Sequence, residues 1–302
     1  CGITIKNPII AASGTFGYGL EFEQFFDISL LGGFCTKGLS LEPMAGTAPG
    51  RIHETPAGML NAIGLENVGV EGFVKEKLPR LEHCGCHIVA NVLGKTLDEF
   101  KTIARRLDQY PQVSALELNI SCPNIKEGGI EFGHDPLMTF AVTEAVRNAT
   151  SKPVWVKLSP NVTDIRLFAR ACQDAGADAV SLVNTFVGMS IDVNKRRPML
   201  SNTTGGLSGP AIRPLAVRMA YEASQVVSIP IVGIGGISTA RDALEFLLAG
   251  ASAVQIGTAN FYDPTVTIKV IEGLRDYCRQ QGIGDINEIV GSLEVREEQF
   301  FY

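Results

Sequence analysis

The stretch ALELNISCPN, residues 115–124, decides the fold class of this chain. Residues 115–118 form a short run that is nearly all apolar, and the run leads into Asn119, with Cys122 three positions further on. The run is too short for a helix, and a nearly uninterrupted apolar run is typical of a parallel strand that is buried on both faces. The stretch therefore predicts a strand whose carboxyl end leads directly into polar side chains.

Similar apolar runs recur along the whole chain, at residues 9–12, 33–36, 88–90, 154–156, 179–183, 231–234 and 253–256. Amphipathic helical patterns lie between them, at residues 97–107, 137–148, 165–175, 215–227 and 240–249. About eight alternations of strand and helix predict an α/β fold, a (β/α)8 TIM barrel. Residues 186–206 break the pattern and are expected to form an inserted hairpin or loop after the sixth strand. Because no linker or low-complexity segment is present, residues 1–302 are expected to form a single domain.

The composition limits the partners of the chain. The 302 residues carry a formal net charge of -6 and give a pI near 5.4. Binding of nucleic acid needs a concentrated basic face, so no nucleic-acid partner is expected. No run of about 18 apolar residues occurs and the first residues lack the layout of a signal peptide, so we expect a cytosolic protein without a membrane partner. Seven scattered cysteines are typical of reduced thiols rather than of a disulfide framework.

The sequence HCGCH, residues 83–87, is the strongest candidate for a metal-binding site because it contains two histidines and two cysteines. It lacks a second cysteine pair at the spacing of zinc sites, and it lies where a loop leads into the apolar run at 88–90. We therefore predict an ordinary surface loop there and no metal site.

Each apolar run leads directly into a polar residue or a glycine. The residues in these positions are Ser13, Lys37, Asn91, Asn119, Lys157, Asn184, Gly235 and Gly257. In a barrel the carboxyl ends of all strands meet on one rim, where barrel enzymes build their active sites. A packed core alone has no need for such a ring, so the pattern predicts a functional site at this rim.

Cys122 is the candidate catalytic residue of the rim. An unperturbed thiol titrates near about 8.5, so an enclosed polar pocket could poise Cys122 as a general base. Asn119 and Asn124 could hold a planar imide or ureide through neutral hydrogen bonds, which favours a pyrimidine-like substrate. The alternative is a buried structural cysteine. Gly128 and Gly129 could hinge a loop that closes over the substrate, or belong to an ordinary flexible loop.

Lys37 and Lys157 each stand directly after an apolar run, and this position indicates an anionic or electron-rich ligand. A buried ammonium without a partner costs roughly several kcal/mol, so each lysine should face a ligand or, alternatively, form a salt bridge with a rim carboxylate. Asn61 lies in GMLNAIGLEN, residues 58–67, which we interpret as a glycine-containing loop that curls against a small planar molecule. By itself Asn61 could also be a simple turn residue.

The last two strands are followed by Gly235-Gly236 and by Gly257-Thr258. Loops at these two positions of a TIM barrel commonly bind a phosphate through backbone N–H groups. The alternative interpretation is a pair of tight turns between strand and helix.

These stretches together closely resemble the dihydroorotate dehydrogenases of the soluble class that uses a cysteine base. The matching stretches are GMLNAIGLEN, ELNISCPN followed by GGIEFG, VKLSPNVTDI, LVNT, GGLSGPAIRP, IVGIGGI and IGTANF, which span nearly the whole chain. Within that class, GGIEFG and NAIGL look like the NAD-linked (class 1B) catalytic subunit. The resemblance implies a homodimeric core within a heterotetramer, with a partner subunit that carries FAD and a 2Fe-2S cluster and passes electrons to NAD. The chain itself has neither a dinucleotide fingerprint nor a cysteine cluster for iron and sulfur.

The resemblance also implies the ligands of the rim and their contacts. One FMN per chain would contact Ser13, Lys37, Gly38, Asn91, Asn119, Lys157, Val183, Gly209, Gly235, Gly236, Gly257 and Thr258, with its phosphate on the last four. The substrate would contact Lys37, Asn61, Ala62, Ile63, Gly64, Leu65, Asn119, Asn124, Asn184 and Thr185.

The implied activity is the oxidation of dihydroorotate to orotate in de novo pyrimidine biosynthesis. Cys122 would remove a proton from C5 while hydride leaves C6 for N5 of FMN, and Lys157 would stabilise the charge that grows on the flavin. Two alternatives are another FMN barrel that acts on a dihydropyrimidine, such as the flavin domain of dihydropyrimidine dehydrogenases, and a flavin-free phosphate-binding isomerase or lyase. A non-catalytic binding module would leave the cysteine, the lysines and the amides without a purpose.

Overall fold

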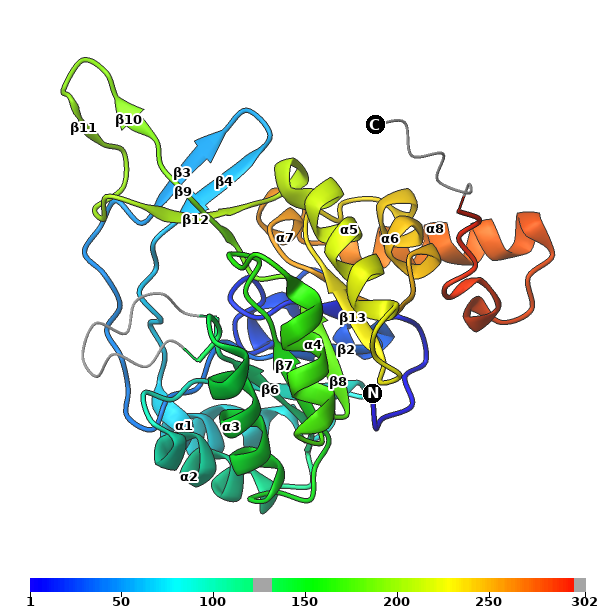
Figure 1. Ribbon diagram of the computed structural model, residues 1–302, viewed down its shortest axis with the longest axis horizontal. Coiled ribbons are helices and arrows are strands. Elements are labelled where there is room, and N and C mark those ends of the chain that lie inside the picture. The colour runs from blue at the N-terminus through cyan, green and yellow to red at the C-terminus, as the bar shows by residue number, and fades with distance from the viewer. Residues whose placement is uncertain (122–131, 296–302) are drawn as a thin grey trace.

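Eight parallel strands close into a barrel in the computed structural model, which describes residues 1–121 and 132–295 (Figure 1). The order around the barrel is β1-β14-β13-β8-β7-β6-β5-β2. The strands are β1 (Ile9–Ala11), β2 (Gly33–Cys35), β5 (His87–Val92), β6 (Val113–Asn119), β7 (Val154–Lys157), β8 (Ala179–Leu182), β13 (Ile231–Ile234) and β14 (Ala251–Ile256). All eight apolar runs of the sequence are barrel strands, so the predicted (β/α)8 fold is confirmed.

The helices lie on the outside of the barrel (Figure 1). The five predicted helical patterns correspond to α2 (Leu97–Asp108), α3 (Pro136–Arg147), α4 (Ile165–Asp174), α5 (Arg213–Ser224) and α6 (Ala240–Leu248). The structure adds the long helix α8 (Val266–Gln281) and the single turns α1 (Gly69–Gly72) and α7 (Ala259–Tyr262). Helix starts follow ordinary capping chemistry, since the Thr96 side chain accepts from the Glu99 N–H at the start of α2. No helix in the described ranges is long and apolar enough to cross a bilayer.

The floor of the barrel interior is apolar. One residue from each barrel strand contributes to a single buried cluster: Ile10, Cys35, Val89, Ala115, Trp155, Ala179, Val232 and Ala253. The N-terminal segment closes this layer from below, because Cys1, Ile3 and Ile5 pack against it and the Trp155 indole donates to the Cys1 carbonyl at 2.8 Å. A second, larger cluster fills the space between the strands and the helices. The barrel is therefore a packed core at its amino end, and any open site must lie at the other end.

The segment that breaks the barrel pattern does form an inserted hairpin after the sixth barrel strand. It contains β9 (Phe186–Gly188), the short hairpin of β10 (Ile191–Asp192) and β11 (Arg197–Pro198), and β12 (Gly205–Ser208). Strands β9 and β12 join β3 (Ile52–Thr55) and β4 (Gly58–Asn61) in a four-stranded antiparallel sheet of order β3-β4-β12-β9. Figure 1 shows this sheet beside the barrel mouth, with the hairpin projecting beyond it.

The expectation of a loop over residues 58–67 was only partly right. Residues 58–61 form strand β4, which pairs with β12, and the loop begins at Ala62. Gly58 lies in a strand and not in a curled loop. A Cβ at this position would lie 2.1 Å from the Ser208 carbonyl oxygen. The glycine instead permits the close approach of two strands.

Asp242 connects α5 to α6 just below the loop that follows β13. Its buried carboxylate accepts from the Ser238 N–H and hydroxyl and from the Thr239 N–H, each at 2.9 Å, and it pairs with Arg213 of α5. Burial raises the pKa of Asp242, but the hydrogen bonds from Ser238 and Thr239 outweigh it and hold the pKa below its usual value.

We expect Asp242→Asn to lower the free energy of unfolding by about 1–3 kcal/mol at pH 7, because Arg213 and the three donors of Ser238 and Thr239 lose a charged acceptor. A carboxyl whose pKa is depressed by folding stabilises the native state above the pKa of the unfolded chain, about 3.9, and loses this effect as the pH falls further. The difference between variant and wild type, measured by urea denaturation, should therefore shrink below about pH 4. Asp276→Asn, which removes an exposed pair with Arg279 on α8, is the matched control and should cost less than about 0.5 kcal/mol. Equal effects of the two variants would contradict the assignment.

Candidate functional site

A cavity of about 1640 Å³ opens between the barrel mouth and the four-stranded sheet. Every predicted site residue that the structure describes lines it: Ser13, Lys37, Gly38, Asn61, Ala62, Ile63, Gly64, Leu65, Asn91, Asn119, Lys157, Val183, Asn184, Thr185, Gly209, Gly235, Gly236, Gly257 and Thr258. Cys122 and Asn124, and the glycines at 128 and 129, lie outside the described residues. Strand ends that are far apart in the sequence thus converge on one cavity, as the polar ring of the sequence indicated.

A polar layer lies directly above the apolar floor of the barrel. Side chains two residues apart on a strand point to the same face, so the floor residues predict which residues form the next inward layer. Two positions beyond Val89, Ala115, Ala179 and Ala253 stand Asn91, Glu117, Ser181 and Gln255, all fully buried. Two positions beyond Cys35 and Trp155 stand the two lysines, Lys37 and Lys157. On six of the eight strands the next inward residue is therefore polar, whereas β1 and β13 carry Ala12 and Ile234 at this level.

Glu117 is the centre of this polar layer. Its carboxylate accepts from the Asn91 amide at 2.7 Å, from the Ser181 hydroxyl at 2.9 Å and from the Gln255 amide at 2.6 Å. All three contacts are buried, where a missing acceptor would be costly. Glu117 lies within the apolar run at residues 115–118, and nothing in that run predicts this role.

The bond from Asn91 to Glu117 sets the direction of the amides above it. With its amide nitrogen bound to Glu117, Asn91 turns its oxygen toward Asn119, whose nitrogen lies 3.5 Å away. The Asn119 oxygen then accepts from the Asn184 nitrogen at 3.3 Å. A carboxylate can only accept, so the chain Asn184 to Asn119 to Asn91 to Glu117 runs in one direction. The donor and acceptor pattern that faces the cavity is thereby fixed before any ligand binds.

Lys157 carries a buried charge at the same level. Its side chain is 5% exposed, and its ammonium donates to the Ser13 hydroxyl at 3.2 Å. Within residues 1–121 and 132–295, neither Lys157 nor Lys37 forms a salt bridge, so the alternative of a structural ion pair finds no support there. Both ammoniums are left to face the cavity and can stabilise a negative or electron-rich ligand.

The loop that follows β4 is held from both sides. The Asn61 amide donates to the Gly206 carbonyl of β12 at 3.1 Å, which fixes the start of the loop. Asn67 fixes its end: its oxygen accepts from the Gly69 N–H at 2.7 Å and its nitrogen donates to the Leu65 carbonyl at 2.8 Å. Gly64 has a φ of +74°, and a Cβ there would lie 2.6 Å from the Thr47 nitrogen. Asn67, which the sequence analysis did not single out, anchors the loop without lining the cavity.

Three backbone segments that line the cavity form a cradle, at Gly209, at Gly235-Gly236 and at Gly257-Thr258. Gly236 has a φ of +67°, and a Cβ at this position would lie 2.7 Å from the Gly209 carbonyl oxygen. A Cβ at Gly257 would meet only ordinary contacts, beginning at 3.6 Å, so the protein itself does not require a glycine there. The Thr258 hydroxyl donates to the Ser208 hydroxyl at 2.7 Å, which joins this cradle to the sheet. A small, backbone-lined cradle of this kind can accept the oxygens of an anion.

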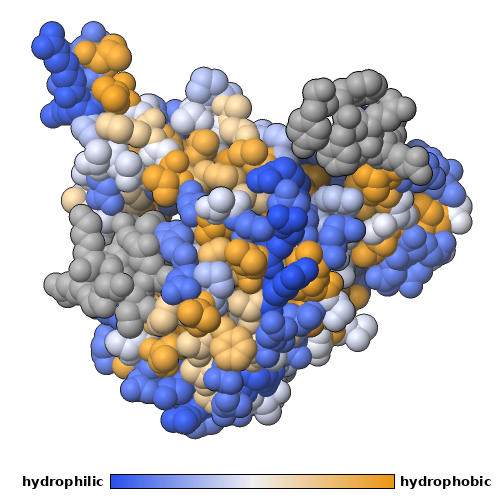
Figure 2. Space-filling view, viewed as in Figure 1, coloured by the Kyte–Doolittle hydropathy of each residue, from blue (hydrophilic) through white to orange (hydrophobic). Residues whose placement is uncertain are grey.

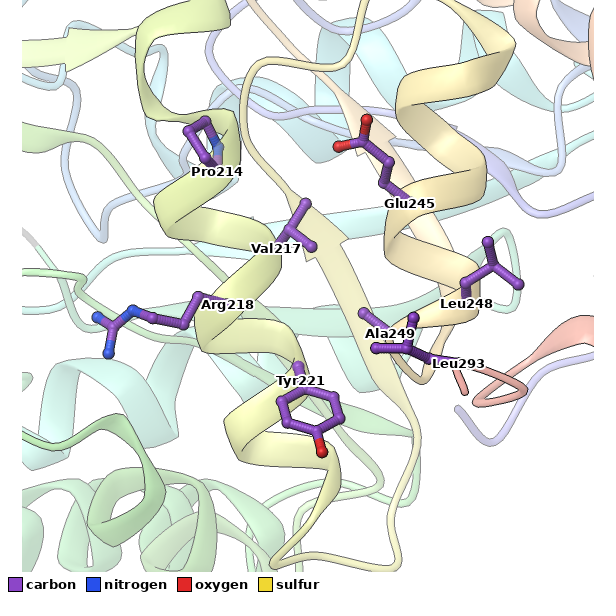
Figure 3. Close-up of a pocket in the computed structure, with 8 residues that line it drawn as sticks. All are labelled: Pro214, Val217, Arg218, Tyr221, Glu245, Leu248, Ala249 and Leu293. Carbon is purple, nitrogen blue, oxygen red and sulfur yellow. The ribbon is translucent and has the colours of Figure 1, made fainter. Parts of the chain in front are cut away.

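A second depression, of about 390 Å³, lies between α5 and α6 on the outer ring (Figure 3). Its lining is mainly apolar and includes Val217, Tyr221, Leu248 and Leu293. It contains none of the predicted site residues and lies against the outer helices instead of the strand ends. The cavity at the barrel mouth is therefore the candidate active site.

A polar cavity at the carboxyl ends of the barrel strands is typical of TIM-barrel enzymes, and this is the class of protein that the geometry defines. The family model for dihydroorotate dehydrogenase matches residues 1–277. The chain therefore belongs to the dihydroorotate dehydrogenase family, and the resemblance found in the sequence is confirmed. Membership makes the chain an oxidoreductase of pyrimidine biosynthesis.

Several curated relatives are similar over nearly the whole chain. The proteins named dihydroorotate dehydrogenase B (NAD(+)), catalytic subunit, from Geotalea uraniireducens (strain Rf4) and Geotalea daltonii are each 55% identical to this chain, over 97% of it and 96% of the relative. The protein of the same name from Geobacter sulfurreducens is also 55% identical over the same shares. The likeness thus extends to the NAD-linked class that the GGIEFG and NAIGL motifs indicated.

We expect Glu117→Gln to lower the free energy of unfolding by about 1–3 kcal/mol, because its amide would place a donor against neighbours that also donate. Gln255→Glu alone should also destabilise, since it brings a second carboxylate against Glu117. The double exchange Glu117→Gln with Gln255→Glu restores a donor opposite an acceptor and should recover at least about half of the loss. Chemical denaturation of the four proteins gives the coupling energy. Purely additive losses would show that the direction of the hydrogen bonds is unimportant.

Proposed function

We propose that this chain oxidises dihydroorotate to orotate with one bound FMN, and that electrons leave through a partner subunit to NAD. The observation that carries the proposal is the convergence of two lysines and the oriented amides Asn91, Asn119 and Asn184 on one cavity that also contains a backbone cradle. The family and the names of the relatives supply the substrate.

The residues around the cavity fit FMN. The phosphate would bind the cradle at Gly235, Gly236, Gly257 and Thr258, where any larger side chain at 236 would collide with Gly209. The ring system would lie near Lys157, Ser13 and the amides. The cavity exceeds the roughly 300–1,000 Å³ of ordinary small-molecule sites, which leaves room for a second, small ligand beside the flavin.

The substrate would occupy the part of the cavity between the amides and the loop at residues 61–65. Lys37 can meet its carboxylate, which supplies local positive charge in an acidic protein. Asn119 and Asn184 present groups of fixed direction to the ring of the substrate, together with Asn124 and Thr185. Neutral amides suit a ring that both donates and accepts hydrogen bonds.

In the reaction, Cys122 would take the proton from C5 of dihydroorotate as the general base. FMN supplies the acceptor for the hydride that leaves C6. The Lys157 ammonium, held by Ser13 at 3.2 Å, would stabilise the negative charge that develops beside it. The Glu117 network holds the side-chain amides of Asn91, Asn119 and Asn184 in one orientation, which reduces the rearrangement needed in the transition state.

The electron acceptor is proposed to be a partner subunit with FAD and a 2Fe-2S cluster, bound to a homodimer of this chain in a heterotetramer. The printed names of the relatives include the words catalytic subunit, which supports a second kind of subunit. The inserted hairpin exposes Ile191 and Val193, and apolar side chains are visible on it in Figure 2. Exposed apolar residues on a projecting element are typical of interaction surfaces. The six described cysteines are free thiols, in keeping with a cytoplasmic location.

The substrate and the cofactor can be tested together on the purified protein. The protein should be yellow, and anaerobic dihydroorotate should bleach the flavin in a stopped-flow experiment far faster than dihydrouracil does. Bleaching by dihydrouracil alone would point to another dihydropyrimidine enzyme. A colourless protein that takes up no FMN would favour an isomerase or lyase. Iron and FAD assays on material that copurifies from the native source test the partner.

We expect Cys122→Ser to slow flavin reduction by dihydroorotate by about 10²–10⁴-fold and to move the pH optimum upward, because a hydroxyl is a weaker acid than a thiol. FMN should remain bound, since the base contacts the substrate rather than the cofactor. Cys278→Ser, on the outer helix α8, is the matched control and should leave the rate unchanged. Reduction at the wild-type rate in Cys122→Ser would remove Cys122 from the mechanism.

A further inference from the structure

The HCGCH segment at residues 83–87 has no part in the proposed reaction. It lies between the 3-10 turn Leu78–Leu81 and the amino end of β5, at the opposite end of the barrel from the cavity. Cys84 and Cys86 are both partly exposed, and both also pack against the core. They are also separated by only one residue, which limits the distance between their Cα atoms to about 7 Å.

Gly85 bends the chain between the two cysteines, and its surroundings fix the bend. The φ of Gly85 is +70°, and a Cβ there would lie 2.8 Å from the Ser29 Cβ. The Lys6 ammonium donates to the Gly85 carbonyl at 2.9 Å and to the Ser29 carbonyl at 2.6 Å. The Cys84 sulfur lies 3.3 Å from the Cys86 carbonyl oxygen. The turn therefore brings the Cys84 thiol back against Cys86, where the two side chains influence each other.

The two histidines do not complete a metal site. Both ring nitrogens of His87 are engaged, Nδ1 with the Ser114 hydroxyl at 2.9 Å and Nε2 with the Thr4 carbonyl at 2.8 Å. In the described part of the chain, no group of three or more His, Cys, Asp or Glu side chains could hold a metal ion. The pair of thiols is what remains to be explained.

The two sulfurs are chemically unequal. The hydrogen bond from the Cys86 thiol lowers the pKa of Cys84 to about 6, helped by the Cys86 and Cys84 N–H groups and opposed by burial and by Glu23. The same hydrogen bond raises the pKa of Cys86, with burial and Asp27 acting in the same direction and Lys6 against it. Cys84 is therefore the more acidic thiol of the pair and Cys86 the less acidic one. This is the arrangement of an attacking and a resolving thiol.

Three other cysteines in the described ranges lack these features. Cys35 and Cys172 are fully buried, and burial raises the pKa of each. Burial also raises the pKa of Cys278. These three thiols are therefore poor nucleophiles and serve as internal references for reactivity.

We propose that Cys84 and Cys86 form a redox-active dithiol that exchanges with low-molecular-weight disulfides. The Cys84 thiolate attacks one sulfur of the disulfide, which forms a mixed disulfide on Cys84 and releases the first thiolate, which takes up a proton. Cys86 then loses its proton and attacks the Cys84 sulfur, which closes the Cys84–Cys86 disulfide and releases the second thiolate. The protein dithiol is oxidised by two electrons, and one disulfide is reduced to two thiols.

The test uses the whole purified protein with glutathione disulfide as the probe, under anaerobic conditions. After the remaining thiols are blocked, trypsin cleavage at Arg80 and Lys95 gives a peptide, residues 81–95, that contains both cysteines and no other. We expect this peptide to lose about 2 Da, to resist alkylation, and to recover its two thiols when reduced glutathione is added. Peptides with Cys35, Cys172 and Cys278 should stay unmodified over the same time.

Two variants separate the roles of the sulfurs. Cys86→Ser removes the resolving thiol and should accumulate glutathione on Cys84, whereas Cys84→Ser should react at this segment at least about tenfold more slowly than wild type. Cys278→Ser is the matched control and should behave as wild type. A wild-type peptide that stays a dithiol, or that stops at the mixed disulfide, would overturn the proposal. Because these wild-type readings need no variant, a variant that fails to fold leaves the test intact.

Discussion

The Glu117 carboxylate is the constraint on which the site depends. It is a fully buried acceptor at the centre of the barrel, and hydrogen bonds from β5, β8 and β14 end on it. A carboxylate cannot donate, so each neighbour must turn a nitrogen or hydroxyl toward it, and the asparagines further out must follow. One group below the cavity thus decides which atoms the cavity presents. The desolvation of Glu117 is offset by three contacts that only a closed barrel supplies.

The residues that pack the barrel core and the residues that line the candidate site lie at different levels along the barrel axis. At the amino end, residues from all eight strands pack around Trp155, and the first residues of the chain cover them. One inward step further, six of these strands carry a polar side chain (Lys37, Asn91, Glu117, Lys157, Ser181 and Gln255), whereas β1 and β13 carry Ala12 and Ile234. The apolar floor holds the strand spacing, and that spacing determines whether Asn91, Glu117 and Gln255 can meet. Lys157 stands two residues beyond Trp155, so one strand links the floor of the barrel to the charge in the cavity.

The sequence predicted the barrel because each strand carries its own local signal, a short apolar run with a polar residue at its end. The same logic placed the lysines, amides and glycines at one rim, and they do line one cavity. Strand β4 was taken for a loop because glycine and asparagine are common turn residues, and the run itself does not show that Gly58–Asn61 pairs with β3 on one side and with β12 on the other. Glu117 was missed because its partners lie 26, 64 and 138 residues away in the sequence. The alternation of side chains along a strand predicts that Glu117 points into the barrel. Only the closed barrel identifies its hydrogen-bond partners.

The antiparallel sheet over the cavity has a consequence for how the molecule matures. Its central pairing joins Asn61 to Gly206, positions 145 residues apart, on segments inserted after different barrel strands. The entropy of closing so long a loop favours this pairing only once the intervening strands have assembled. A nascent or partly folded chain would thus possess the lysines and amides of the mouth before it possesses a lid for them. Ligand capture should accordingly be among the last properties that the folding chain acquires, and it would stabilise the pairing that completes it.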